Sequence, residues 1–289
     1  MIVEIVSIGY GVVSMLGWGF GDFIAKRIIG PLGYYRLLLY IQLVGLAPLF
    51  LLAAMFTPQA PSSPTTISLI IATAICSVSA LFFFYKGLTV GKASIITPVA
   101  STSAIVAMAL SFAILGETLS LLQIICIAVV LAGVLVISMR SHSDGRSSEG
   151  IPYAVACMLS AGFNSVLVKL VSMDIGGIGA LFFNRVLVTL ILLMLLPFFR
   201  NSFSHHIGRR VSLKTIVMAG LTEFVGFFSF IVGVGVGIVS LIAPISSASP
   251  AVTVVLAQVF LKERLVPIQK VAVVSVILGI ALLSALSGV

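Results

Sequence analysis

The second half of this chain repeats the first at a fixed offset of 146 residues. Residues 91–138 align with residues 237–284 without a gap, and fifteen of the 48 aligned positions are identical. Upstream the match is weaker and the offset changes, so that Lys26 aligns with Lys169 and Arg36 with Arg185. We therefore expect two copies of one structural unit, residues 1–140 and 151–289, joined by a polar cytoplasmic linker at 141–150. The identical pairs include Gly91/Gly237, Ser94/Ser240, Pro98/Pro244, Ser101/Ser247, Ser103/Ser249, Glu117/Glu263, Gln123/Gln269 and Gly133/Gly279.

Each copy is too apolar for a soluble domain. The chain is 60% hydrophobic and only 8% charged, whereas a soluble globular protein carries about 25% charged residues. These values predict a protein that crosses the lipid bilayer many times. The first apolar run has neither a basic segment before it nor a signal-peptidase motif, so we interpret it as a retained span. The cysteines Cys76, Cys126 and Cys157 lie inside apolar runs and are interpreted as packing residues.

A membrane-spanning helix needs about 20 apolar residues, and the chain contains ten such runs. The prediction is therefore an all-α polytopic membrane protein with ten transmembrane helices, five in each repeat. Because five is odd, the two repeats must cross the bilayer in opposite directions, which makes them inverted repeats. The predicted spans are 5–28, 34–56, 67–88, 93–115, 120–139, 151–171, 177–199, 213–234, 238–260 and 267–286.

The basic residues orient this bundle. If the ten spans are right, 14 of the 16 Lys and Arg residues fall at loops on one side, and only Lys169 and Arg185 belong to the other. The positive-inside rule places the basic side in the cytoplasm. We therefore expect a multi-pass protein of the inner or plasma membrane with both termini outside the cytoplasm. The net charge of +8 follows from this topology, and no nucleic-acid partner is expected.

The end of each repeat carries a short motif. Thr97-Pro98 and Ala243-Pro244 lie in the fourth and ninth spans, and Gly116-Glu117-Thr118-Leu119 and Lys262-Glu263-Arg264-Leu265 follow them. Gln123 and Gly133 recur as Gln269 and Gly279. In these features the chain resembles the drug/metabolite transporter superfamily, in particular its ten-helix EamA-type family. The resemblance implies a secondary carrier such as an exporter of amino acids, other metabolites or drugs, and related branches exchange sugar nucleotides or phosphate esters.

Glu223 is the sharpest candidate for a functional residue. It lies ten residues into the span 213–234, between small residues at 219, 220 and 226. An ionised side chain at the bilayer centre costs about 2.5–3.5 kcal/mol on insertion scales, so such a residue is either functional or paired. One interpretation is a substrate-binding or proton-coupling carboxyl in a cavity. The other is a structural ion pair with Arg185, Lys169 or Arg36.

Four further positions are candidates for the cavity wall. Trp18, Asp22 and Lys26 share one face of the first span, so Trp18 and Asp22 could line the cavity, or Asp22 could simply neutralise Lys26. Asn164 lies at the depth of the glycine-rich segment 17–21 in the other repeat and could line the cavity or bond across helices. Tyr85 is the aromatic residue of the run 82–85 that we expect to face the cavity, because a buried hydroxyl needs a partner.

Pro98 and Pro244 are predicted to kink the fourth span of each repeat. A kink frees a backbone carbonyl four residues earlier and can act as a hinge, or it can merely shape the bundle. The hydroxyls of Thr97, Ser101, Ser103, Ser246, Ser247 and Ser249 lie nearby and could contact a polar substrate. Glu117 and Glu263 each precede the following helix, where a carboxylate can cap its N-terminus.

The remaining classes of function fit poorly. The chain lacks the HExxH and GxSG motifs and has no histidine within a span, so an intramembrane enzyme is not expected. No cofactor and no metal site are expected, because metal-ligand spacing is absent. The sequence thus predicts a monomeric secondary transporter of a small organic solute, with a proton-coupled exporter of lipophilic cations and a sugar-nucleotide or phosphate-ester exchanger as the alternatives.

Overall fold

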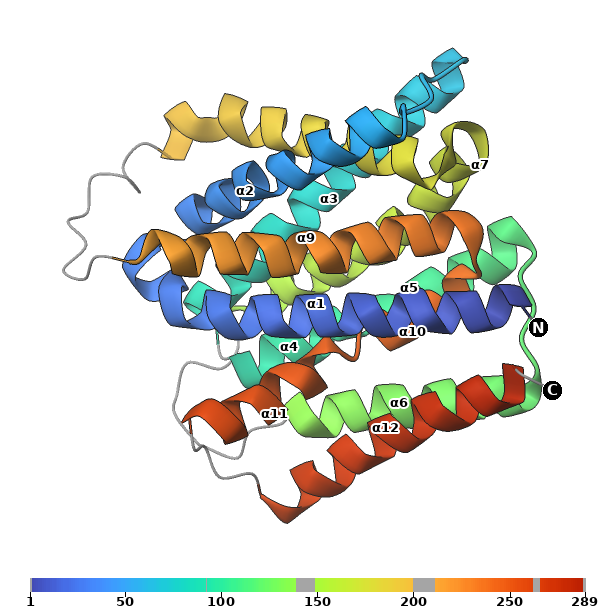
Figure 1. Cartoon of the computed structure of the whole chain (residues 1–289). Coiled ribbons are helices and arrows are strands. Elements are labelled where there is room, and N and C mark those ends of the chain that lie inside the picture. The colour runs from blue at the N-terminus through green and yellow to red at the C-terminus, as the bar shows by residue number, and fades with distance from the viewer. Residues whose placement is uncertain (1, 92, 139–148, 200–210, 262–265, 288–289) are drawn as a thin grey trace.

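The computed structural model of the chain describes residues 2–91, 93–138, 149–199, 211–261 and 266–287, and these residues form a bundle of helices (Figure 1). The first repeat contributes five helical regions in chain order. The helix of the third predicted span begins at Pro64, and Ser63 caps its N-terminus. The Ser63 side chain accepts a hydrogen bond from the Thr66 amide, and Pro64 is in the first turn. The elements are α1 (Ile2–Leu32), α2 (Tyr34–Met55), α3 (Pro64–Val90), α4 (Ala93–Ser101), α5 (Ser103–Leu110), the π-helical turn η1 (Ser111–Leu115) and α6 (Leu121–Ser138).

The second repeat has a matching series of elements. Its first two predicted spans form one long helix that is interrupted at Gly176, where φ is 71° and ψ is 165°. Only glycine adopts this conformation readily, so Gly176 can turn the chain between the two predicted spans. The elements are α7 (Ile151–Leu195), the 3₁₀ turn η2 (Leu196–Phe199), α9 (Leu213–Val236), α10 (Val239–Ser246), α11 (Ser249–Leu261) and α12 (Pro267–Ser287).

Seven helices of the described chain are long and apolar enough to cross a membrane, and two shorter apolar helices cover 99–115 and 121–137. The difference from ten has identifiable causes. The sixth and seventh predicted spans are continuous in α7 and count as one helix, and the fourth and fifth predicted spans correspond to the two shorter apolar helices. The chain is therefore a multi-pass membrane protein, while the count of ten remains a prediction.

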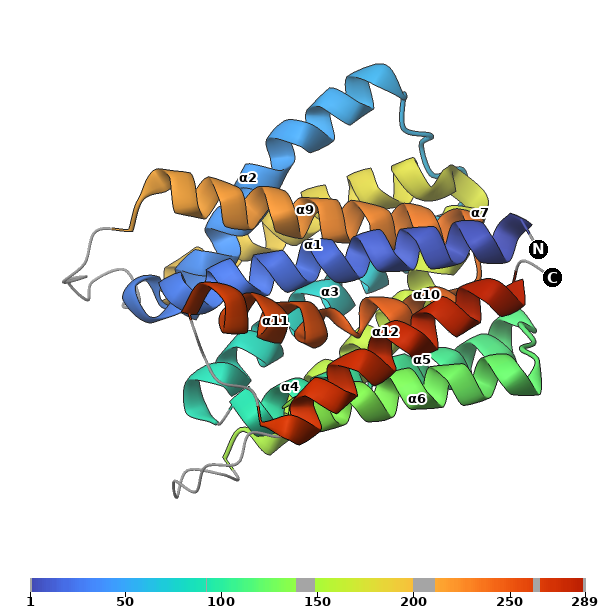
Figure 2. The ribbon, with the colours of Figure 1, turned by 60° about the horizontal axis from the view of Figure 1, so that its bottom comes forward.

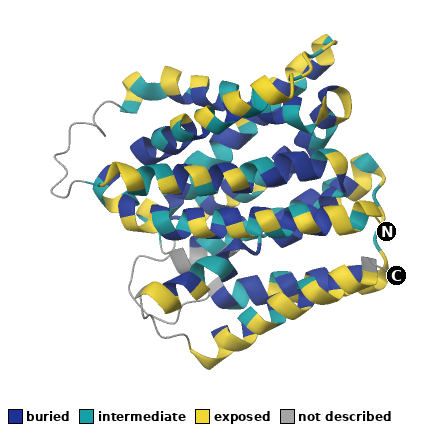
Figure 3. Cartoon of the chain, in the orientation of Figure 1, coloured by how far each residue is buried: buried dark blue, intermediate teal, exposed yellow. Residues whose placement is uncertain are grey.

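Exposed residues cover the outer faces of the helices (Figure 3), and many of them are apolar. Large hydrophobic side chains on several helices are exposed, among them Leu51, Met194, Phe260, Val271 and Ile277. A soluble protein does not expose contiguous apolar surface on this scale, whereas lipid tails cover it without cost. The polar side chains are sequestered instead, and Arg36, Gln42, Asn184, Arg185 and Glu223 are all buried.

The contacts between the repeats are reciprocal. The first helix of the first repeat, α1, packs on α9, and the corresponding first part of the second repeat, in α7, packs on α3. Gly19 and Gly162 show the same relation in detail. A Cβ atom at Gly19 would lie 2.4 Å from the Cβ of Val252, and one at Gly162 would lie 2.5 Å from that of Val106. Val106 and Val252 occupy equivalent positions in the two repeats. The same glycine–valine contact therefore forms twice, each time between the two repeats.

The last helices of the two repeats, α6 and α12, pack on each other at one side of the bundle (Figure 2). A Cβ atom at Gly133 would lie 2.7 Å from Val276, and one at Gly279 would lie 2.7 Å from Val130. In each contact, the glycine of one repeat thus packs against the valine of the other repeat. Glycine, with no side chain, allows the two helices to approach closely.

Both ends of the chain lie at the same end of the bundle (Figure 1). This arrangement fits an even number of membrane crossings, and the side on which the termini lie stays a prediction. The predicted linker 141–150 falls mostly outside the described residues, as do His142, His205 and His206.

Candidate functional site

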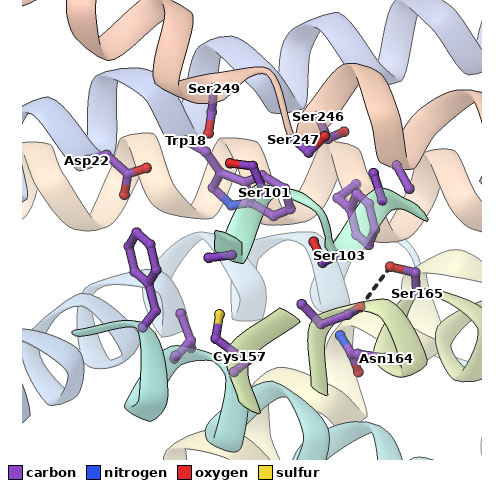
Figure 4. Close-up of a pocket in the computed structure, with 18 of the residues that line it drawn as sticks. Trp18, Asp22, Ser101, Ser103, Cys157, Asn164, Ser165, Ser246, Ser247 and Ser249 are labelled. Atoms are coloured by element: carbon purple, nitrogen blue, oxygen red, sulfur yellow. Dashed lines mark hydrogen bonds between the residues drawn. The ribbon is translucent and has the colours of Figure 1, made fainter. Parts of the chain in front are cut away.

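A cavity of about 220 Å³ lies in the middle of the bundle and is lined by both repeats. Figure 4 shows hydroxyl groups on its wall, with Ser101 and Ser103 facing the group of Ser246, Ser247 and Ser249. Four of the five predicted site residues, Trp18, Asp22, Asn164 and Glu223, line this cavity. The other lining residues include Ser77, Ala80, Leu81, Phe84, Thr97, Ala100, Ala104, Cys157, Ala161, Ser165, Phe227, Phe230, Ala243 and Pro250.

Helix α1 brings Trp18 and Asp22 to the cavity through close contact with two helices of the other repeat. A Cβ atom at Gly17 would lie 2.5 Å from the backbone nitrogen of Gly226, so α1 and α9 touch backbone to backbone. On its other side, the Thr253 hydroxyl of α11 donates a hydrogen bond of 3.0 Å to the Gly19 carbonyl. The Trp18 ring then packs against Phe230, with 5.2 Å between the ring centroids.

Asp22 lines this cavity (Figure 4). Lys26 is exposed, and the structure shows no ion pair between these two residues although it describes both. The alternative in which Asp22 serves to neutralise Lys26 is therefore not what the structure shows.

Glu223 faces the cavity and also forms an ion pair. Its Oε2 atom lies 2.8 Å from Nη1 of Arg185, whose side chain is fully buried. The Nη2 atom of Arg185 donates a second hydrogen bond of 3.0 Å to the Ile41 carbonyl. Space for the guanidinium comes from Gly45, where a Cβ atom would lie 2.0 Å from Nη2. The structure thus shows the ion pair with Arg185, one of the expected partners, and places the same carboxylate on the cavity wall; its role in binding substrate or coupling protons stays a prediction.

Asn164 is held in a polar cluster between α3 and α7. The Ser77 hydroxyl lies 3.3 Å from Oδ1 of Asn164, and Nδ2 of Asn184 donates a bond of 3.1 Å to Ser77. Asn184 is 1% exposed, and the sequence reading missed it, although an asparagine inside an apolar span is a usable signal. Asn164 therefore combines both expected roles, as a lining residue and as part of a bond between helices.

Tyr85 is placed differently from the sequence-based expectation. Its side chain is buried in a hydrophobic core formed by α1, α2, α3, α7 and α9 and is absent from the cavity lining, whereas the preceding residue, Phe84, lines the cavity. Successive side chains on a helix differ by about 100° in direction, and Tyr85 lies on a side of α3 that packs into this core. The rotation of α3 follows from its packing, chiefly against α7 of the other repeat, and the run of aromatic residues carries no signal for it.

The fourth helix of each repeat is interrupted beside the cavity. Helix α4 ends at Ser101 and α5 begins at Ser103, while α10 ends at Ser246 and α11 begins at Ser249. The interruptions lie three to five residues after the prolines rather than at them. In the second repeat, Pro250 stands in the first turn of α11, a position where proline starts a helix, and the side chain of Pro98 lies outside the described groups.

Glu117 caps a helix as predicted, but the helix is α10 of the other repeat and not the following helix, α6. Its carboxylate accepts bonds of 2.8 Å from the amides of Val239 and Ser240 at the start of α10, in the other repeat. The positive φ of Gly116, 64°, turns the chain before this residue. Helix α6 is capped instead by Ser120 and Gln123, which exchange backbone and side-chain bonds.

Ser7 completes this junction between the repeats, and Lys169 holds the turn before α10 within the second repeat. The ammonium group of Lys169 donates to the carbonyls of Gly235 and Gly237 at 3.2 and 2.8 Å. The Ser7 hydroxyl accepts a bond of 2.9 Å from the Ile238 amide. Three successive amides at the start of α10 are therefore bound by side chains of the first repeat. Within the described residues no group of three His, Cys, Asp or Glu side chains could hold a metal ion.

An apolar helical bundle with a hydroxyl-rich cavity between two reciprocal repeats is the architecture of a membrane carrier. The sequence profile of the EamA-like transporter family matches residues 5–139 and again residues 148–285. The chain therefore belongs to the EamA-like transporter family, a family of membrane transporters within the drug/metabolite transporter superfamily.

Two further comparisons agree with this assignment at the level of fold and repeat. A solved protein structure is similar with a TM-score of 0.80 at 16% sequence identity, over 97% of this chain and 96% of the other. An uncharacterized protein of Methanocaldococcus jannaschii is 26% identical over 131 residues, which are 45% of this chain and 95% of that relative. That relative is thus about as long as one repeat of this chain.

Proposed function

We propose that this protein is a secondary active transporter that exports a small organic metabolite such as an amino acid. The observation that carries the proposal is the central cavity, which both repeats line with hydroxyl, amide and carboxylate groups. Secondary carriers bind their solute at the interface between two repeats, near the middle of the membrane. Among the described lining residues there are two carboxylates and neither lysine nor arginine, which disfavours a phosphate-ester substrate.

The interrupted helices support a substrate with a carboxylate. The first turns of α5 and α11 begin at Ser103 and Ser249, which both line the cavity. Helix N-termini carry partial positive charge and attract anionic groups. Ser246 adds an independent sign of a ligand, because its side chain is 1% exposed and its hydroxyl has no partner among the described residues.

Alternating access between inverted repeats is the proposed mechanism, in a monomer with ten spans. The reciprocal contacts of Gly19 and Gly162 support two structural units that can rock against each other. In this proposal the contact of Glu117 with α10 keeps the solute path closed at the end of the bundle that holds the termini, which the charge distribution assigns to the outside of the cell membrane. The contact must open when the solute leaves on that side.

A counterflow assay tests the proposal. The purified protein is placed in liposomes that contain an unlabelled mixture of amino acids. These liposomes should take up a labelled amino acid faster than liposomes that hold the protein but no amino acids inside. A channel would show no such acceleration, and neither would a binding protein without transport. Failure with amino acids but acceleration with cationic dyes would favour the alternative described next.

A proton-coupled exporter of lipophilic cations is the second candidate. It is favoured by the presence of two carboxyl groups, Asp22 and Glu223, on one cavity with Trp18, Phe227 and Phe230. A carboxyl that binds a proton and a cation in turn would couple their movements. In liposomes, an imposed proton gradient should then drive the accumulation of a cationic dye.

A further inference from the structure

We infer that the transported solute carries a positively charged nitrogen and that Asp22 is the counter-ion that binds it; this inference rests on the proposed transport function. The Asp22 carboxyl group lies at the wall of the cavity, which Trp18 and Ser249 also line (Figure 4). No hydrogen bond or ion pair joins it to another residue in the described part of the chain. A carboxyl group in such a place is available to bind a ligand that enters the cavity.

The position of Asp22 does not depend on its own side chain. Helix α1 is fixed on one side by the contact of Gly17 with Gly226, and on the other by the bond from Thr253 to Gly19. Both contacts involve the backbone of α1 within five residues of Asp22. The carboxylate is thus presented to the cavity by the packing of neighbouring helices, and its charge is not needed to hold the helix.

The other carboxylate of the cavity is already neutralised. Glu223 and Arg185 are 2.8 Å apart and form a pair with no net charge. Lys26 lies one helical turn after Asp22 on the same face of α1. It is exposed and forms no ion pair with Asp22. Among the described lining residues, Asp22 is therefore the carboxyl group without a basic partner. An ionised carboxylate buried there costs free energy unless a cation accompanies it, so a bound ammonium group is favoured there over an anion.

The rest of the wall suits a small amine. Trp18, Phe84, Phe227 and Phe230 line the cavity, and the faces of aromatic rings attract organic cations. The volume of about 220 Å³ is below the range of about 300–1,000 Å³ that is usual for drug-sized ligands. The geometry thus points to a compact amine or amino acid rather than to a bulky cationic drug.

Four probes of nearly the same shape separate the charge requirement from the shape requirement. These are 2-phenylethylammonium, phenylalanine, 3-phenylpropionate and 2-phenylethanol, which are cationic, zwitterionic, anionic and neutral. Binding to the purified full-length protein is measured by calorimetry. We expect binding of 2-phenylethylammonium, of phenylalanine, or of both, and at least tenfold weaker binding of the other two. Preference for the first probe indicates a free amine as substrate, and preference for the second indicates an amino acid.

The variant Asp22→Asn keeps the shape of the side chain and removes its charge. Loss of a charge-assisted bond should weaken the binding of the ammonium probes about tenfold or more. Asp174→Asn is the matched control, because Asp174 is exposed and accepts a bond of 2.6 Å from Thr66 away from the cavity. This control should bind the probes as the parent protein does. Asp22→Glu, which retains the charge, should bind them better than Asp22→Asn does.

Thermal unfolding distinguishes a binding role from a structural one. Since Asp22→Asn removes an unpaired charge, the variant should unfold at a temperature no lower than that of the parent. A clear decrease would show that the carboxylate holds the fold together, and would overturn the inference. So would unchanged probe binding by Asp22→Asn, or preferred binding of 3-phenylpropionate or 2-phenylethanol. If no probe of any charge binds and counterflow is absent as well, the proposed function itself is wrong.

Discussion

The carboxylate of Glu223 and the guanidinium of Arg185 meet at 2.8 Å inside the bundle, and Arg185 is fully buried. The two residues belong to α9 and α7, which are both in the second repeat. Phe224 and Phe227 flank the guanidinium, with 5.8 and 5.6 Å between its central carbon and the ring centroids. The pair thus places a buried cation directly behind the cavity wall and neutralises the one carboxylate that we expected to exchange protons.

Replacing Glu223 by Gln should destabilise the protein more than it changes the pH dependence of transport. Removing one partner of a buried ion pair leaves an uncompensated charge and typically costs about 3–5 kcal/mol. Thermal unfolding in detergent should show the decrease, and the double variant Arg185→Met, Glu223→Gln should regain part of it. A stable Glu223→Gln protein whose transport has lost its pH dependence would instead support proton coupling at this residue.

Gly19→Ala and Gly162→Ala should each lower the stability of the bundle by about 1–3 kcal/mol. The added methyl group would lie 2.4 Å from Val252 in the first variant and 2.5 Å from Val106 in the second. Gly9→Ala is the control, because a Cβ atom at Gly9 meets nothing within 4 Å. The yield of folded protein and its unfolding temperature measure the effect, and equal values for all three variants would contradict the reciprocal packing.

Glu117→Gln should weaken the closed end of the cavity. The amide cannot carry the negative charge that complements the start of α10, and loss of a good N-terminal cap costs about 0.5–2 kcal/mol. The cavity residue Cys157 offers a readout in a variant whose other cysteines, Cys76 and Cys126, are replaced by Ala.

A membrane-impermeant maleimide applied from the side of the termini should label Cys157 faster in Glu117→Gln than in the parent. Asp174→Asn, a neutralised carboxylate elsewhere on the protein, serves as the control. Equal labelling rates in the parent and in Glu117→Gln would show that the contact does not restrict access.

Pro98→Ala and Pro244→Ala should reduce turnover more than they reduce expression. Each substitution restores a backbone donor beside the interruption of the fourth helix, and a straighter helix should move less easily. Initial rates of counterflow per folded protein provide the measurement. Parent rates in both variants would exclude a hinge at these prolines, and would direct attention to Pro250 at the start of α11.

A reporter fused to the C-terminus should lie outside the cytoplasm. The reason is the partition of basic residues, 14 of 16 on one side of the predicted ten-span topology. Alkaline phosphatase is active only outside the cytoplasm, and green fluorescent protein fused directly to the chain is fluorescent only inside. A fluorescent fusion without phosphatase activity would reverse the orientation.

The sequence alone determined the class of the protein and the division into repeats. Apolar runs identify membrane segments because lipid has no partner for polar groups, and the identities at offset 146 reveal the duplicated unit. The EamA-type resemblance, which the family profile confirms, follows from motifs local in the chain. Trp18, Asp22, Asn164 and Glu223 could be chosen as candidates because a polar or aromatic side chain in an apolar span needs a reason.

Tertiary structure decided which partner each of these residues has. Whether Phe84 or Tyr85 faces the cavity depends on the rotation of α3, which packs chiefly on α7 of the other repeat. The choice of Arg185 as the partner of Glu223 depends on the space at Gly45, which is 140 positions away in the chain. The carboxylate of Glu117 caps α10 because the two repeats meet there. Such contacts join residues that are distant in sequence, so no local pattern specifies them.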